Sequence, residues 1–178
     1  MKLLFISDIH GIKSNLEIIK NKFNEFNCDK LIVLGDLYYL SHYFRDNEDY
    51  DVQYVKDFLE SFKDKMLCIR GNCDSDEDIN ASSFSIIDEI SSLQLENKEL
   101  YLTHGHIYNE KNWKKDNSIL VFGHYHIPFI LEEGTKFFIN PGSISQPRNN
   151  NPTYLYFDGK EFIIYDIYDK IVDRRKIF

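Results

Sequence analysis

The sequence is poor in cysteine and has no long hydrophobic run. Its three cysteines are Cys28, Cys68 and Cys73. Because their number is odd and none forms a C-x-x-C pair, reduced thiols are favoured over a disulfide framework. No apolar stretch approaches the roughly 20 residues of a membrane-spanning helix, and the N-terminus carries no signal-peptide pattern. These absences argue against a disulfide-rich secreted protein and against a membrane protein, and we expect a cytoplasmic one.

Basic residues are outnumbered by acidic ones. The chain has 21 Lys and Arg against 29 Asp and Glu, a formal net charge of −8. Since broad binding to nucleic acid needs a basic surface, no extended nucleic-acid binding is expected, whereas a small phosphate ester remains compatible. The sequence has no G-x-S-x-G motif, no P-loop and no internal repeat. At 178 residues, 43% of them hydrophobic, it suits one domain spanning 1–178.

Histidine is where the sequence becomes informative. All six histidines except His42 belong to a set of five short polar stretches. The stretches are Asp8-Ile9-His10, Gly35-Asp36, Gly71-Asn72-Cys73-Asp74, His104-Gly105-His106 and Gly123-His124-Tyr125-His126. Imidazole and carboxylate donors together suit transition metals, whereas an all-oxygen shell suits Ca or Mg. Residues two apart project to the same side of an extended chain, so both Asp8 with His10 and His124 with His126 can converge on one site.

Each polar stretch follows an apolar run of strand type. The runs cover residues 3–6, 31–34, 66–69, 100–102 and 119–122. Short continuous runs are typical of strands buried on both faces, and open α/β sheets bind ligands at the carboxyl ends of their strands. The neighbouring glycines let the backbone turn sharply and come close to an ion. The pattern predicts five buried strands that deliver the ligands of two metal ions to one place.

The segments between the strands predict the rest of the architecture. Apolar residues at helical spacing predict helices at 13–26 and 52–62, which with their flanking strands form parallel βαβ units. The remainder predicts a mostly antiparallel half with three hairpins. These are expected at 84–103, 129–139 and 153–168.

Three further segments have alternative interpretations. The aromatic-rich segment 37–51 suits a substrate rim, a lid or a subunit contact, or it packs back onto the sheet. The acidic stretch 74–78 lacks the glycine and the glutamate of a calcium loop, and a solvated acidic turn is expected there. The basic end 174–176 predicts an exposed strand end.

The order of the motifs points to a family. Along the chain they read D-x-H, G-D, G-N-C-D, a histidine in T-H-G-H, and G-H-x-H. This arrangement resembles the calcineurin-like metallophosphoesterase superfamily and, with the closing Asn140-Pro141-Gly142-Ser143, looks most like its small YfcE-type phosphodiesterases over essentially the whole chain. The resemblance implies an α/β (α+β) fold, a four-layer αββα sandwich of two mixed β-sheets flanked by helices. It also makes a homo-oligomer, a dimer or tetramer, plausible.

The resemblance further implies a site in which seven side chains hold two divalent ions. The first ion would take Asp8, His10 and His126, the second Asn72, His104 and His124, and Asp36 would bridge them. A metal-bridging hydroxide would then attack phosphorus in a small phosphodiester. Mn is the metal expected first, with Zn, Ni or Fe as alternatives.

One residue departs from the general pattern of the superfamily. Cys73 stands where many members have a histidine able to protonate the leaving oxygen, and a thiol is a poor general acid for that step. Since general acid catalysis is typically worth about 10² to 10⁴ in rate, esters with good leaving groups should be favoured and monoesters should react weakly or not at all. Two roles are open for His106, replacing that acid or making a structural hydrogen bond. Asp74 is expected to orient a ligand histidine.

Candidates for substrate contact are fewer. His42 and Arg45 lie where YfcE-type sequences have a histidine and an arginine, so with Asn72 they are candidates for binding the phosphate. In that family a Gly-Pro pair separates the histidine from the arginine. Here Tyr43-Phe44 stands in its place, so the shape of this loop is expected to differ.

Other functions compete with a phosphodiesterase. The same fold serves as a non-enzymatic interaction scaffold in Vps29-like proteins, but those lack parts of the ligand set that is intact here. A phosphomonoesterase, a protein phosphatase or a nuclease of the same superfamily is the alternative among enzymes. The short acidic chain and Cys73 count against these.

Overall fold

The five apolar runs that precede the polar stretches all form strands in the computed structural model, which describes residues 1–39 and 47–178. These strands are β1 (Leu3–Ile6), β2 (Lys30–Val33), β3 (Met66–Ile69), β6 (Lys98–Thr103) and β7 (Ser118–Phe122). β1 and β7 are buried along their whole length. The predicted strands are confirmed, and they are divided between two sheets.

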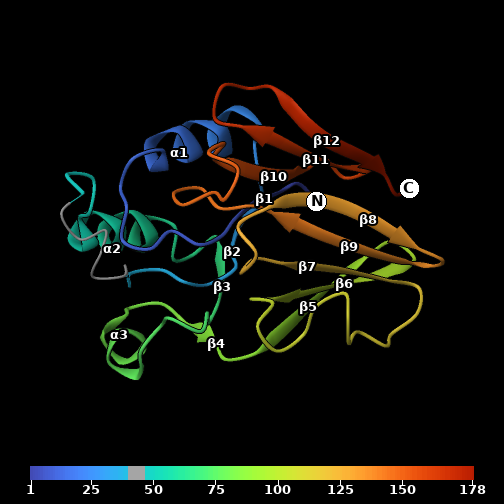
Figure 1. Ribbon diagram of the computed structural model, residues 1–178, viewed down its shortest axis with the longest axis horizontal. Helices are drawn as coiled ribbons and strands as arrows, with labels where there is room; N and C mark the ends of the chain where they lie inside the picture. The colour runs from blue at the N-terminus through green and yellow to red at the C-terminus, as the bar shows by residue number, and fades with distance from the viewer. Residues whose placement is uncertain (40–46) are drawn as a thin grey trace.

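A seven-stranded sheet, in the order β12-β11-β10-β1-β2-β3-β4, contains the first three of them (Figure 1). β1 to β4 run parallel, and β10 pairs with β1 in the antiparallel sense. The other strands of this sheet are β4 (Ile86–Ile87), β10 (Thr153–Phe157), β11 (Glu161–Asp166) and β12 (Ile171–Lys176). The predicted βαβ units and the predicted hairpin at 153–168 are both confirmed.

A five-stranded sheet, in the order β5-β6-β7-β9-β8, forms the second layer. Its remaining strands are β5 (Ile90–Leu95), β8 (Pro128–Glu133) and β9 (Lys136–Pro141). The β5–β6 and β8–β9 hairpins are antiparallel as predicted, but the central pairs β6–β7 and β7–β9 are parallel. The expected antiparallel half is therefore wrong at the centre of this sheet, because the connection 104–117 returns the chain from β6 to β7 and strand β8 returns it from β7 to β9. The hairpin predicted from residue 84 also begins too early, since β4 pairs with β3 in the other sheet.

The two sheets pack face to face, and two helices cover the outer side of the seven-stranded sheet (Figure 1). Leu3 of β1 belongs to the cluster between the sheets, whereas Leu4 packs with α1 (Leu16–Glu25) and α2 (Val52–Ser61). This alternation is the period of two expected for a strand buried on both faces. α1 starts later than predicted because Asn15 takes a left-handed conformation with φ 73°.

The outer face of the five-stranded sheet is covered by the connection 105–117. Trp113 packs there with Tyr101 and Phe122, and its Nε1 donates a hydrogen bond to Ser118 Oγ at 2.9 Å. The described residues of this connection form turns and contain no helix. The two-sheet sandwich is confirmed, with an irregular segment in place of helices as its fourth layer.

The acidic stretch differs from the solvated turn that was expected. Ser75 caps α3 (Asp76–Ala81) by accepting a hydrogen bond from the amide of Asp78 at 3.1 Å. Asp74 is only 4% exposed, because its carboxylate accepts hydrogen bonds from buried backbone amides. The basic end 174–176 is exposed on β12, as predicted.

Asp74 ties the end of β2 to the end of β3. Its Oδ2 accepts hydrogen bonds from the amides of Asp36 at 2.9 Å and Gly71 at 2.7 Å, and its Oδ1 accepts one from the amide of Leu37 at 2.7 Å. Burial raises the pKa of this carboxyl, and the bonds from these amides oppose the rise. The expected contact of Asp74 with a ligand histidine is not found among the described residues. Asp74 instead holds the backbone of Asp36.

No helix within residues 1–39 and 47–178 combines the length and the apolar character needed to cross a membrane.

Replacing Asp74 with Ala should lower the free energy of unfolding by at least about 3 kcal/mol, because three buried amides lose their acceptor. The control is Asp76→Ala, which removes a largely exposed carboxylate and should cost less than about 1 kcal/mol. Urea denaturation of the metal-free protein measures both. Equal stability of the two variants would mean that the Asp74 contacts do not hold the strand ends together.

Candidate metal centre

The polar stretches that follow β1, β2, β3, β6 and β7 bring their side chains together. Among the described residues, three groups of side chains each bring their ligand atoms within 4.8 Å of one another. The groups are Asp8 with His10 and His126, Asp8 with Asp36 and His104, and His10 with Asp36 and Cys73. Because each group shares members with the others, they form one cluster, and the first group is the ligand set predicted for the first ion.

The backbone at the cluster has an unusual conformation. Five residues of the polar stretches lie in the left-handed region, with φ between 52° and 65°. They are Asp8, His10, Asp36, His124 and His126. Non-glycine residues rarely adopt this conformation, and where they do they cluster at functional sites.

Hydrogen bonds to the backbone fix the orientation of three imidazoles. Nδ1 of His10 lies 2.7 Å from the carbonyl oxygen of Tyr39, Nδ1 of His104 lies 2.6 Å from that of Leu34, and Nδ1 of His126 lies 2.7 Å from that of Gln146. A carbonyl only accepts, so each Nδ1 carries a proton and donates it. In the neutral ring, each Nε2 is then left with a lone pair for a metal ion, which is the usual arrangement of a ligating histidine.

The Nε2 atoms and the carboxylates face a common space. His10 Nε2 lies 3.4 Å from His126 Nε2 and 3.7 Å from Asp36 Oδ2. On the other side, His104 Nε2 lies 3.5 Å from Asp36 Oδ1. The two oxygens of Asp36 therefore point toward histidines of two different ligand sets, as a bridging carboxylate requires.

The buried carboxylate of Asp8 gives an independent test of whether a cation fits. Asp8 is fully buried, and its Oδ1 has no hydrogen-bond partner among the described residues. It lies 3.3 Å from His126 Nε2. Buried polar atoms are almost always satisfied, so an orphaned carboxylate oxygen beside imidazole nitrogens fits a metal ligand. The residues present thus suit divalent ions.

The electrostatics of the cluster favour positive charge. Burial opposes ionisation of Asp36, but the hydrogen bond and charge of His104 hold the pKa of Asp36 well below its usual range. For His104, burial works against protonation, and the carboxylates of Asp36 and Asp8 outweigh it and raise the pKa to about 9. A site that draws protons onto a buried imidazole also attracts a divalent cation, which must displace them.

The residues predicted for the second ion lie on the more open side. Asn72 is exposed, and its Oδ1 lies 3.0 Å from His104 Nε2. The ring centroid of His124 lies 5.2 Å from that of His104, and the His124 amide donates a hydrogen bond to Asp8 Oδ2 at 3.1 Å. These three side chains are neighbours, as the predicted set requires.

Two glycines are needed for the close approach of the strand ends. A Cβ at Gly71 would collide with the backbone nitrogen and Oδ1 of Asp36, and one at Gly123 would collide with Ser7 Oγ. Both positions therefore exclude larger residues.

Cys73 lies at the edge of the cluster. Its amide donates a hydrogen bond to Asp36 Oδ1 at 2.8 Å, so the backbone of Cys73 helps to orient the bridging candidate. Burial and the charge of Asp36 raise the pKa of the thiol to about 12. A thiol with such a pKa keeps its proton at neutral pH, which makes it a weak acid for protonating a leaving group.

The remaining candidates are placed differently. The exposed ring of His106 forms no hydrogen bond with the described part of the chain, so the structural bond considered for it is not found there. His106 lines a cleft with Arg70, Asn72, Asp88 and Glu89. His42 and Arg45 lie outside the described residues.

The aromatic segment is only partly described. Tyr38 is buried, and its carbonyl accepts a hydrogen bond from the hydroxyl of Tyr50 at 3.3 Å. Tyr39 is 43% exposed, although its carbonyl orients His10. In its described part, the segment thus both packs onto the sheet and contacts the site.

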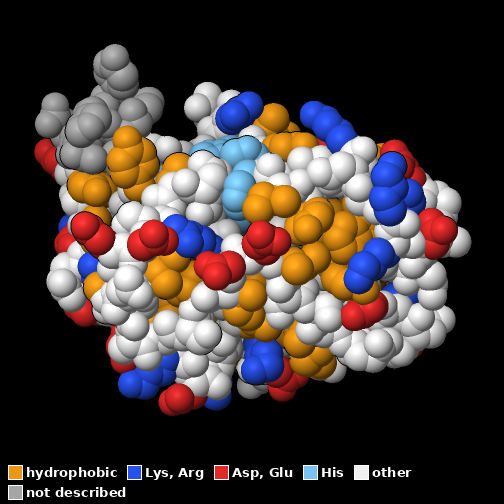
Figure 2. Space-filling model, turned by 90° about the horizontal axis from the view of Figure 1, so that it is seen from below, with side chains coloured by type: hydrophobic (Ala, Val, Ile, Leu, Met, Phe, Trp, Pro, Cys, Tyr) orange, Lys and Arg blue, Asp and Glu red, His pale blue; other side chains and the backbone are white. Residues whose placement is uncertain are grey.

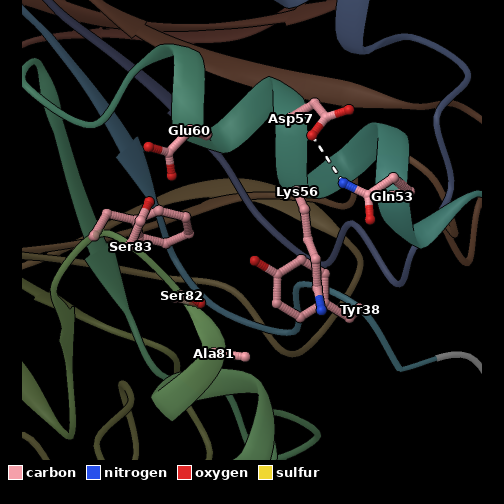
Figure 3. A pocket seen from close by; sticks show the side chains of 9 residues that line it. Tyr38, Gln53, Lys56, Asp57, Glu60, Ala81, Ser82 and Ser83 are labelled. Carbon is pink, nitrogen blue, oxygen red and sulfur yellow. Dashed lines mark hydrogen bonds between the residues drawn. The ribbon is translucent and has the colours of Figure 1, made fainter.

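A second hollow lies away from the cluster, between α2 and residues 81–84 (Figure 3). Lys56 covers the ring of Tyr38 there, with Nζ 5.2 Å from the ring centroid, and Gln53 donates a hydrogen bond to Asp57 at 2.9 Å. Other polar groups of the hollow are bonded outside it, since Glu60 pairs with Lys63 and Ser82 donates to the carbonyl of Asp78. The chemistry is concentrated at the histidines, which reach the surface in Figure 2.

Comparison with known proteins agrees with this geometry. The model of the calcineurin-like phosphoesterase superfamily domain matches residues 1–161. The curated phosphodiesterase YfcE of Escherichia coli is 37% identical over 156 residues, which cover 85% of this chain and 84% of that protein. A probable metallophosphoesterase of Bacillus subtilis, YsnB, is 27% identical over 157 residues, 83% of this chain and 78% of that protein.

Solved structures agree as well. The structure of the E. coli phosphoesterase Yfce superposes with a TM-score of 0.91 at 33% identity and full coverage of both chains. A structure of Vps29 from Entamoeba histolytica, solved with Zn²⁺, reaches 0.61 at 20% identity and covers 99% of this chain and 98% of its own, a likeness of fold alone. By its family match, its close relatives and its strand-end motifs, this chain belongs to the calcineurin-like phosphoesterase superfamily.

Proposed function

We propose that this protein is a phosphodiesterase that works with two divalent metal ions on small phosphodiesters. The observation that carries the proposal is the place of Asp36, whose two oxygens face His10 and His104 from separate ligand sets. Membership of the family, together with the metal-binding groups, implies divalent metals. The name of the E. coli relative, a phosphodiesterase, supports the choice of reaction.

Seven side chains hold the two ions in this proposal. Asp8, His10 and His126 would hold the first, Asn72, His104 and His124 would hold the second, and Asp36 would serve both. Two such ions supply Lewis-acid activation of water and a clamp on the attacking and leaving oxygens. The chain's own part is positional: the backbone carbonyls of Tyr39, Leu34 and Gln146 aim the imidazoles, and the amide of Cys73 holds Asp36.

Mn is the metal we propose first. The proposed ligand set offers imidazoles, carboxylates and one amide oxygen, and it contains no thiolate. A donor set without thiolate suits Mn, with Fe, Ni and Zn as alternatives.

Three finer proposals concern the protein as a whole. Cys28 and Cys68 are buried free thiols, which supports a reducing compartment such as the cytoplasm. Large hydrophobic side chains at the surface, among them Ile107, Ile127 and Leu131, support a homo-oligomer. The acidic net charge supports a small-molecule substrate over extended nucleic acid.

An interaction scaffold of the Vps29 type is the alternative from another class. The buried Oδ1 of Asp8, which has no hydrogen-bond partner among the described residues, counts against it. Burying a carboxylate oxygen without a hydrogen bond or a cation lowers the stability of the fold, and a protein that only docks partners gains nothing from it.

The metal-loaded protein should hydrolyse an aryl phosphodiester with a good leaving group at least about 10-fold faster than the matching monoester, in keeping with the name of its E. coli relative, a phosphodiesterase. Steady-state kinetics with bis(4-nitrophenyl) phosphate and 4-nitrophenyl phosphate in Mn²⁺ would test this. Faster turnover of the monoester would assign the protein to the phosphomonoesterases.

Asp36→Asn and His124→Ala should each lower turnover by more than about 100-fold and reduce the bound metal, since each removes a ligand. Metal content by mass spectrometry and diester kinetics measure the two effects. Asp57→Asn on α2 is the matched control and should change neither. Full metal content and full rate in both site variants would refute the ligand set.

Cys73→His should raise the rate with poorer leaving groups by roughly 10-fold, the low end of what a general acid supplies, and should change the rate with activated esters little. A series of aryl diesters of increasing leaving-group pKa provides the measurement. If the dependence on leaving-group pKa is the same in the variant and the wild type, the thiol is not what limits the leaving-group range.

A further inference from the structure

The segment from Asn140 to Arg148 is tied to the ligands of the first ion. The hydroxyls of Ser143 and Ser145 both donate to the carbonyl of Asp8, at 2.9 and 2.8 Å. The carbonyl of Gln146 accepts the proton of His126 Nδ1. The segment thus contacts both ends of the Asp8–His126 pair and is held in register with it.

Arg148 is the last residue of this tied segment. Its amide donates a hydrogen bond to the carbonyl of His126 at 3.1 Å, and the residue is exposed. Its backbone position relative to His126 is therefore fixed, while its side chain is exposed to solvent.

The guanidinium of Arg148 differs from those of the other described arginines. Arg70 pairs with Asp76 and Asp88, at 2.7 and 3.5 Å. Arg174 pairs with Glu161 at 3.4 Å, and Arg175 pairs with Glu132 at 3.8 Å. Within the described part of the chain, Arg148 has no carboxylate partner. In a protein with a net charge of −8, a guanidinium without a carboxylate partner, on a residue whose amide bonds to His126, is a notable exception.

The other side of the cluster is less suited to an anion. The cleft at His106 is lined by Asp88 and Glu89, and its arginine, Arg70, is already neutralised. Figure 2 shows acidic side chains below the surface histidines, with a basic side chain among them, and only basic ones close above the histidines. The carboxylates of Asp88 and Glu89 therefore disfavour an anionic ester on the side of His106.

We propose that Arg148 binds the non-bridging oxygens of the phosphodiester and contributes to substrate affinity, not to metal binding. This inference rests on the proposed function. A guanidinium presents paired N–H donors that match the geometry of two phosphate oxygens, and it is always charged. A phosphodiester carries one negative charge, so one guanidinium matches it.

The test compares the metal-loaded wild type with Arg148→Ala, Arg148→Lys and the exposed control Arg174→Ala. Arg148→Ala should weaken inorganic phosphate binding and raise KM for bis(4-nitrophenyl) phosphate about 10-fold, equivalent to roughly 1.4 kcal/mol, with kcat changed less than about threefold. The phosphate affinity and KM of Arg148→Lys should lie between those of the wild type and Arg148→Ala, because lysine keeps the positive charge but lacks the paired N–H donors of the guanidinium. Metal content should be unchanged in all three variants, and Arg174→Ala should match the wild type throughout.

Two results would overturn the inference. One is a phosphate affinity of Arg148→Ala equal to that of the wild type, and the other is loss of bound metal in that variant, which would make Arg148 part of the support of the centre. Titration calorimetry with inorganic phosphate keeps this test separate from the proposed function. A wild type that binds phosphate but hydrolyses no diester would refute the phosphodiesterase, while the calorimetry would still decide the role of Arg148.

Discussion

The constraint on which the rest of the structure depends is the crowding of Asp8, Asp36 and their histidines into one small buried space. Carboxylates without solvent repel each other, and imidazole lone pairs that face one another gain nothing from the contact. The protein meets this cost with backbone groups. Asp74 clamps the strand ends that carry Asp36, and carbonyl oxygens hold the rings. Cations then complete an arrangement that the polypeptide alone leaves unbalanced.

The same crowding explains why the fold places loops where it does. The parallel strands β1, β2 and β3, and the parallel pair β6 and β7, all end at the cluster. Parallel neighbours bring their carboxyl ends together, so each strand can add a side chain without a long excursion. The antiparallel strands, by contrast, serve mainly to extend the sheets and to return the chain.

Much of this could be predicted from the sequence because the signals are local. An apolar run followed by Asp8 or His104 indicates both a strand and a ligand at its tip. What could not be predicted depends on partners far along the chain. Nothing about Leu34 or Gln146 marks a carbonyl that will orient a histidine 70 or 20 residues away. The buried clamp of Asp74 resembled a solvated turn because its amide partners belong to other segments, and the break between β4 and β5 falls within what looked like one strand.

The left-handed backbone at five of the clustered residues has a consequence for how such a chain can change. Glycine would occupy those positions without strain, whereas aspartate and histidine there cost on the order of 1 kcal/mol each. Substitution to glycine would therefore relieve strain at the same step that removes a proposed ligand. A related protein that no longer needed catalysis could replace these residues and keep the same fold, without the backbone strain and without metal. This chain has kept the strained aspartate and histidine residues.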